Sequence, residues 1–191
     1  MQQWRVPLVD LVAQYLSIKD EIDAAVSRVM GRGNYVMGEE VEEFEQEWAR
    51  YCRAKHCVGV SSGTDALYIS IRAAALVKAQ IVVPALTFIA TLEAVVRAGA
   101  TPVIHDVDPS TAILPPMTAP SIPVALYGRQ VVTAEEGEDM IVDAAQAHGQ
   151  KIGNEIARCF SFYPTKNLGA AGQAGAIVTN NALFADRCRV L

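Results

Sequence analysis

Four short stretches of this 191-residue chain carry polar or otherwise special residues that could do chemistry, and each follows an apolar run. They are residues 61–64, 84–88, 143–148 and 161–166. Short apolar runs are typical of buried strands, and open α/β sheets bind their ligands beyond the carboxyl ends of the strands. The spacing therefore predicts that the four stretches meet at one edge of a sheet.

The first stretch has the composition of an anion-binding turn. Ser62-Gly63-Thr64-Asp65 joins a strand to the start of a helix, and its glycine lets the backbone approach a ligand closely. The N–H groups and the dipole of that helix would favour a phosphate. An ordinary helix N-cap without any ligand would explain the same residues.

Asp143, Lys166 and Phe88 are the further candidates. Asp143 follows an apolar strand, and a buried carboxylate needs a cation or a donor such as a protonated heterocyclic nitrogen. Lys166 follows the aromatic-rich run 160–163, where a desolvated amine would be suited to imine formation. The alternatives are an Asp that caps a helix, a lysine on the surface and a phenylalanine in the core.

The elements that must position these residues alternate between helix and strand. Apolar residues at helical spacing predict helices over 10–30 and 39–52, and strands alternate with helices from Val58 onward. About seven strands are predicted, the last four near 122–126, 140–142, 159–162 and 175–179. The order indicates an α/β fold, a three-layer sandwich with a mostly parallel sheet. Four prolines within 106–121 argue against a helix there.

Composition and charge exclude several classes of protein. Hydrophobic residues make up 51% of the chain, which indicates a globular domain, and the net charge of −5 argues against a nucleic-acid partner. No apolar run reaches the roughly 20 residues of a membrane span, and no signal peptide is evident, so we expect a cytoplasmic protein. The four cysteines form no C-x-x-C pair and no His stands at metal-ligand spacing, so neither disulfides nor a metal are expected.

Five stretches along the chain resemble the DegT/DnrJ/EryC1/StrS family of pyridoxal-phosphate-dependent sugar aminotransferases, which have fold type I. The matching residues are 6–11, 62–67, 87–91, 143–149 and 160–169. The resemblance implies an N-terminal helical segment over 1–55 and a cofactor-binding large domain over 56–191. Family members usually add a smaller C-terminal domain, which this sequence does not show, and have longer crossovers between their strands.

The resemblance also implies a role for each candidate residue. Lys166 would be the Schiff-base lysine and would move a proton between the amino acid and the cofactor. Asp143 would pair with the pyridinium nitrogen of the cofactor, pyridoxal phosphate, and keep it protonated. Phe88 would stack on the ring, and Gln146 would contact the side of the ring that bears the phenolic oxygen. The phosphate would be held by Gly63, Thr64 and Ser161.

The reaction implied by the family is the transfer of an amino group from glutamate to a nucleotide-linked keto-deoxysugar, for example a dTDP-3-keto-6-deoxyhexose, by a homodimer. The alternative is a reduced cofactor-binding domain without transaminase activity that acts as a structural or regulatory partner. The matched cofactor residues favour the enzyme, whereas the shortened crossovers favour the alternative. A sugar dehydratase on the same scaffold is disfavoured, because those relatives replace the lysine that stands here at Lys166.

Overall fold

The structure is a computed structural model that describes residues 8–131 and 139–191. The chain forms two compact units, which divide between Phe44 and Glu45. This division lies before the predicted boundary at residue 55, and the extent of the binding domain remains a prediction. The start of the family-like stretch at 6–11 and the middle of the predicted link at 127–139 lie outside the described residues.

The first unit is helical. Its helices are α1 (Leu11–Ser17), α2 (Lys19–Arg32) and the beginning of α3 (Glu39–Tyr51), which continues into the second unit. The sequence predicted one helix over 10–30, but the backbone leaves helical geometry at Ile18, with φ −130° and ψ 22°. Gly33 ends α2 with a left-handed φ of 67°, a conformation that glycine adopts without steric cost. No residue of α1 or α2 is buried.

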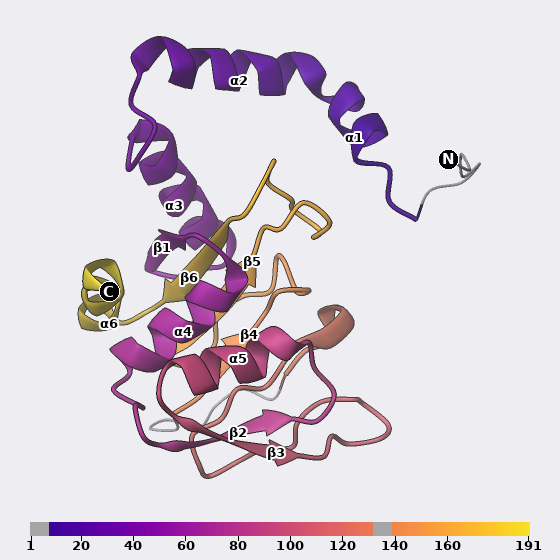
Figure 1. Cartoon of the computed structure of the whole chain (residues 1–191), viewed down its shortest axis with the longest axis vertical. Helices are drawn as coiled ribbons and strands as arrows, with labels where there is room; N and C mark the ends of the chain where they lie inside the picture. Colours follow the sequence, from indigo (N-terminus) through magenta and orange to yellow (C-terminus); the bar gives the residue numbers. More distant parts are fainter. Residues whose placement is uncertain (1–7, 132–138) are drawn as a thin grey trace. The chain divides into compact units, whose positions relative to one another are not determined.

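The second unit contains two β-sheets (Figure 1). The larger sheet has the order β1-β6-β5-β4, and in the smaller sheet β2 pairs with β3. The bounds are β1 His56–Val60, β2 Gln80–Pro84, β3 Thr101–His105, β4 Ile141–Asp143, β5 Ala157–Ser161 and β6 Gly175–Thr179. Strand β4 is parallel to β5 and β2 is parallel to β3, whereas β6 is antiparallel to both of its neighbours.

The predicted single sheet of about seven mostly parallel strands is not confirmed, although the α/β class is. The described residues form six strands in two sheets, and no strand forms over 122–126. Ser121 and Val124 make isolated parallel bridges to β2 and β4, and the chain then enters the 3-10 turn η1 (Leu126–Gly128). Pro123 has no N–H to donate, and this interrupts a continuous ladder.

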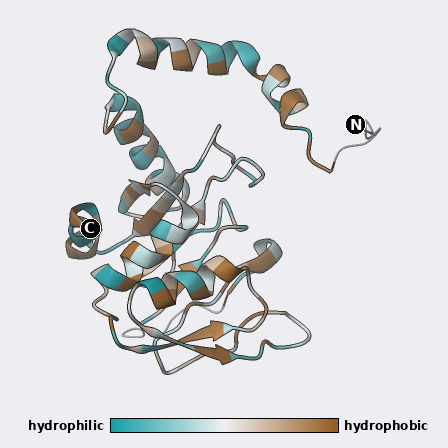
Figure 2. Ribbon diagram, in the orientation of Figure 1, coloured by the Kyte–Doolittle hydropathy of each residue, from teal (hydrophilic) through white to brown (hydrophobic). Residues whose placement is uncertain are grey.

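Helices cover one face of the larger sheet. Helix α4 (Gly63–Ala73) packs on the sheet beside α5 (Ile89–Arg97), and α6 (Ala182–Val190) contacts β1 and β6 (Figure 1). The helices alternate hydrophobic and hydrophilic faces, and β2 and β3 are predominantly hydrophobic (Figure 2). Helix α4 ends at Ala73, and Ala75 just beyond it adopts a positive φ of 58°, which is incompatible with continuing the helix. As predicted, residues 106–121 form no helix.

The last turns of α3 cover the opposite face of β5. Side chains alternate along a strand, so Cys159 packs in the core under α4 while Phe160 points to the other side. The rings of Trp48 and Phe160 meet edge to face, with 5.1 Å between their centroids. Within the described part of the chain, no helix combines the length and the hydropathy needed to cross a membrane.

Candidate active site

Most of the predicted site residues lie where β1, β4 and β5 end, which we call the carboxyl edge. The register pairs Val60 with Gly175 and Gly175 with Ser161, so the end of β1, the start of β6 and the end of β5 lie at one level. Asp143 pairs with Cys159 on the next strand. Because β6 is antiparallel, the loop 162–174 leaves and returns at this same edge, and it carries Lys166.

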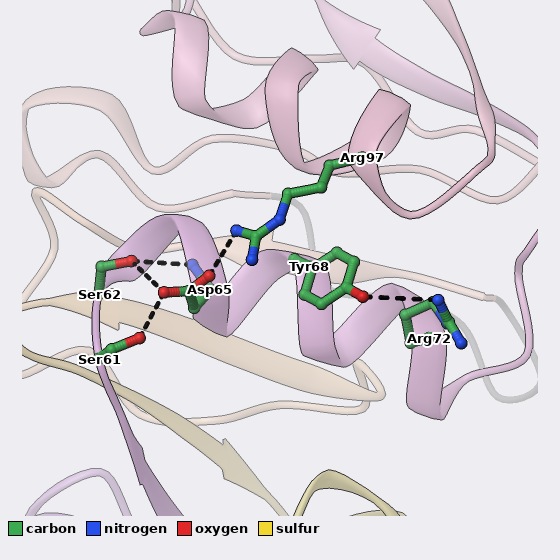
Figure 3. Close-up of polar contacts among 6 residues, drawn as sticks. All are labelled: Ser61, Ser62, Asp65, Tyr68, Arg72 and Arg97. Carbon is green, nitrogen blue, oxygen red and sulfur yellow. Dashed lines mark hydrogen bonds and ion pairs between the residues drawn. The ribbon is translucent and has the colours of Figure 1, made fainter. Parts of the chain in front are cut away.

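The turn after β1 caps the N-terminus of α4, with Ser62 as the N-cap residue. The Ser62 hydroxyl accepts a hydrogen bond from the Asp65 N–H at 3.0 Å, and both serine hydroxyls of the turn donate to the Asp65 carboxylate (Figure 3). Arg97 of α5 holds the same carboxylate at 2.5 Å. The first N–H groups of a helix have no partner within it, so α4 offers donors at its start, as predicted.

Two close contacts hold this turn against the end of β5 and the start of β6. A Cβ on Gly63 would stand 2.6 Å from the Cβ of Ser161, and a Cβ on Gly175 would stand 2.4 Å from the carbonyl carbon of Ser62. Real Cβ atoms essentially never approach this closely, so both positions require glycine. The structure thus brings Gly63 and Ser161, two of the predicted phosphate residues, into contact. Thr64, the third predicted phosphate residue, is the second residue of α4.

Asp143 is buried at the end of β4, with 6% of its surface exposed. One carboxylate oxygen accepts a hydrogen bond from the Thr91 hydroxyl at 2.8 Å, and the other accepts one from the Ala145 N–H at 3.1 Å. Burial raises the pKa of this carboxyl, while the two hydrogen bonds and the positive charge of Lys166 lower it. A cationic ligand would relieve the desolvation of this carboxylate.

Lys166 is half-buried in the loop between β5 and β6, and its backbone N–H donates a hydrogen bond to the Tyr163 carbonyl at 2.8 Å. It lines a cavity of about 600 Å³ together with Gln146. The carboxamide oxygen of Gln146 accepts a hydrogen bond from the Tyr127 N–H at 2.9 Å. The remaining lining residues are Gly128, Ala147, His148, Gln150, Thr165 and Asn167.

Phe88 stands at the start of α5 with 72% of its surface exposed. The alternative of a core phenylalanine is therefore wrong. An exposed ring in a strand-to-helix loop is available to stack on a flat ligand.

Two residues near this edge received no role from the sequence. Thr91 holds Asp143, and the Nε2 of His148 lies 2.8 Å from the Ser161 carbonyl oxygen. Burial lowers the pKa of His148, whose ring is surrounded by Trp48, Phe160 and Phe162. No local signal in the sequence points to the first of these contacts, which joins residues 52 positions apart.

Comparison with known proteins decides the family. The model of the DegT/DnrJ/EryC1/StrS aminotransferase family matches residues 16–191.

The chain belongs to this family.

A curated relative from Saccharopolyspora erythraea, the erythromycin biosynthesis sensory transduction protein EryC1, is 42% identical over 97% of this chain and 57% of its own length. The dTDP-3-amino-3,4,6-trideoxy-alpha-D-glucose transaminase of Streptomyces venezuelae is 39% identical over 98% of this chain and 55% of its own length. The crystal structure of S. venezuelae DesV in complex with a ketimine intermediate is similar, with a TM-score of 0.88 and 37% identity, and covers 99% of this chain and 57% of its own. The chain thus spans little more than half the length of these relatives.

The DegT/DnrJ/EryC1/StrS aminotransferases depend on pyridoxal phosphate, and the solved Bacillus subtilis relative NtdA, with a TM-score of 0.84 and 28% identity, covers 98% of this chain and 48% of its own and carries the cofactor PMP. The residues of this chain fit such a cofactor. Gly63 packs directly against the side chain of Ser161 at the start of α4, whose first N–H groups could bind a phosphate, and the buried carboxylate of Asp143 suits a protonated ring nitrogen. Lys166 supplies a half-buried primary amine in the loop between β5 and β6.

Proposed function

We propose that this chain binds pyridoxal phosphate at the carboxyl edge and belongs to an enzyme that transfers an amino group to a nucleotide-linked keto sugar. The observation that supports the proposal most directly is the buried carboxylate of Asp143 at the end of β4, which is held by the Thr91 hydroxyl and the Ala145 N–H. A buried carboxylate fixed in this way could accept a hydrogen bond from a protonated ring nitrogen.

Each residue has a task in this proposal. The N–H groups of Gly63 and Thr64, with Ser161, bind the phosphate, and Asp143 accepts a hydrogen bond from the ring nitrogen. Phe88 covers one face of the ring and excludes water from it. Gln146 approaches the phenolic oxygen.

Lys166 would hold the cofactor through its Nζ, and the same Nζ would carry a proton between the amino acid and the cofactor. The bound cofactor supplies the electron sink that makes the amino-acid Cα–H acidic. Residues that hold the phosphate and the ring nitrogen would orient the cofactor toward Lys166 in advance, so the entropy of orientation would be lost on binding rather than in the reaction.

The substrate class is proposed from the relatives. Several of them are named as transaminases of dTDP-linked or UDP-linked sugars that act at carbon 3, such as the dTDP-3-amino-3,6-dideoxy-alpha-D-galactopyranose transaminase of Aneurinibacillus thermoaerophilus, 38% identical over 97% of this chain and 58% of its own length. We therefore propose a nucleotide-linked 3-keto-deoxysugar as acceptor, glutamate as donor, a homodimer as the working form and the cytoplasm as its location.

A second candidate is a reduced cofactor-binding domain without transaminase activity. The alignment with EryC1 runs over 209 positions, more than the 191 residues of this chain, so the relative carries residues within the matched region that this chain lacks. Single-turnover mixing with glutamate separates the two candidates: an enzyme converts the cofactor to pyridoxamine phosphate, and a binding domain does not.

Borohydride reduction tests the proposed lysine. The protein is mixed with pyridoxal phosphate, reduced, digested and analysed by mass spectrometry. We expect a stable phosphopyridoxyl adduct at Lys166 and none at the exposed Lys151, and we expect the visible absorbance of the imine before reduction to be lost in Lys166→Ala. Labelling of Lys151 and Lys166 to the same extent would refute a dedicated site.

A further inference from the structure

A chain of three side chains leads from the Phe88 loop to the buried Asp143. The hydroxyl oxygens of Thr87 and Thr91 are 2.7 Å apart, and the Thr91 hydroxyl lies 2.8 Å from a carboxylate oxygen of Asp143. Thr91 is fully buried in the first turn of α5, 52 residues before the carboxylate that it contacts. Phe88 stands between the two threonines in the sequence.

The hydrogens of this chain can be assigned by counting donors. A threonine hydroxyl has one hydrogen, and Thr91 gives it to Asp143, because an ionised carboxylate only accepts. The short contact with Thr87 therefore has Thr87 as donor and Thr91 as acceptor. Hydrogen bonds that point the same way strengthen one another, and one that ends on a charge is the strongest member of such a chain.

We propose that Thr91 is a positioning residue: through its hydroxyl it orients and keeps ionised the carboxylate of Asp143, and through Thr87 it couples that carboxylate to the loop that carries Phe88. The proposal rests on the proposed function for its meaning, since Asp143 and Phe88 would contact the ring nitrogen and the ring face of one cofactor. Thr91 itself would touch neither the ring nitrogen nor the ring face of the cofactor. The geometry of both contacts would then depend on one buried hydroxyl.

The electrostatic setting gives the proposal a direction. The Cys159 thiol near Asp143 stays neutral, because burial raises its own pKa. Beside Thr91, the Ala145 N–H and the Lys166 charge lower the pKa of the Asp143 carboxyl. Burial opposes them and raises the pKa. Removing the Thr91 donor therefore raises the pKa of Asp143 further, and less of it is ionised at neutral pH.

Carbon-13 NMR of the aspartate carboxyls in the cofactor-free protein tests this directly. We expect the titration of Asp143 to move to higher pH in Thr91→Val, which keeps the shape and removes the hydroxyl, and to stay in place in Thr91→Ser. The matched control is Thr179→Val on β6, another fully buried threonine, which donates to the Ile156 carbonyl at 2.7 Å. It lies in register with His56 at the opposite edge of the sheet, and it should leave Asp143 unchanged.

Cofactor binding provides the second measurement. Because a hydrogen bond to a charged group is lost, we expect Thr91→Val to weaken the affinity for pyridoxal phosphate about 10-fold to 100-fold, and Thr91→Ser and Thr179→Val by less than about 3-fold. If Thr91→Val does not fold, Thr87→Val tests the outer link, with a smaller upward shift of the same titration. An unchanged Asp143 titration in Thr91→Val, or in Thr87→Val where that variant is used, overturns the proposal. If the parent protein binds no pyridoxal phosphate, the proposed function fails, and the titration still decides the role of Thr91.

Discussion

Gly63 and Ser161 lie so close together that a methyl group on the glycine would stand 2.6 Å from the Cβ of the serine. Ser161 ends β5, and Gly63, 98 positions earlier in the chain, begins α4. Both residues are predicted to bind the phosphate of the cofactor. Several measurable consequences depend on this edge of the sheet.

Gly63→Ala should damage both stability and cofactor binding. The added methyl must displace the Ser161 backbone or α4, at a cost of about 1–3 kcal/mol in the free energy of unfolding, measured by urea denaturation. Gly31→Ala is the control, because nothing lies within 4 Å of that position in α2. There the change should stabilise by about 0.5–1 kcal/mol, and equal effects at both positions would contradict the close packing of Gly63 against Ser161.

Phe88→Ala should separate binding from stability. The ring is 72% exposed, so the free energy of unfolding should change by less than about 0.5 kcal/mol. The loss of stacking should weaken pyridoxal phosphate binding by about 2-fold to 10-fold, measured by fluorescence titration. Leu183→Ala on α6, at a side chain that is 70% exposed, should change neither quantity. Unaltered binding in Phe88→Ala would remove the ring from the site.

Asp143→Asn should make the cofactor-free protein more stable at neutral pH and should make the cofactor-loaded protein less active. Burial raises the folded-state pKa of Asp143 above the usual 3.8, so the folded protein holds this proton more tightly than the unfolded chain. The parent protein thus loses stability as pH rises from about 4 through the folded pKa, and the Asn variant is spared this loss.

Urea unfolding of both proteins from pH 4 to 8 measures the difference, which should vanish at the acid end. The Thr91 and Thr87 hydroxyls can reverse their hydrogen bonds to face the new amide, so the variant should fold. Its turnover should fall far more than its cofactor affinity. A gap in stability that is the same at every pH would show that the charge of Asp143 is not its source.

Arg189→Met should loosen the attachment of α6 and α3 to the sheet. The Arg189 guanidinium donates to both oxygens of the Glu45 carboxylate, at 3.2 and 2.5 Å, and to the Cys57 carbonyl at 2.9 Å. Glu45 is buried and also accepts from the Gly59 N–H at 2.7 Å. We expect a loss of about 1–3 kcal/mol by urea denaturation.

Arg187→Met is the matched control, because Arg187 is exposed and makes one long contact of 3.4 Å with the Ala73 carbonyl. Its effect should stay below about 0.5 kcal/mol. If the two arginines prove equally important, the Glu45 pair contributes nothing specific.

The sequence predicts the strand ends well and the side-chain partners poorly. Residues 58–60, 141–143 and 159–161 are apolar runs bounded by polar turns, and the structure places strands there. The sequence alone could not show that Pro123 would reduce a strand to isolated bridges, nor that α1 would end before Ile18. Which hydroxyl meets Asp143 depends on how α5 packs against β4, and no local pattern encodes a contact across 52 residues.

The reversed direction of β6 has a consequence for how the protein folds. Strands β5 and β6 pair across one loop, so the segment 157–179 can form early, with little loss of chain entropy, and it already contains Ser161 and Lys166. Strand β1 must instead pair with β6 across more than a hundred residues, a slow, non-local step. We expect the lysine to be in place first, and competence to bind a phosphate to arrive only with the final docking of β1.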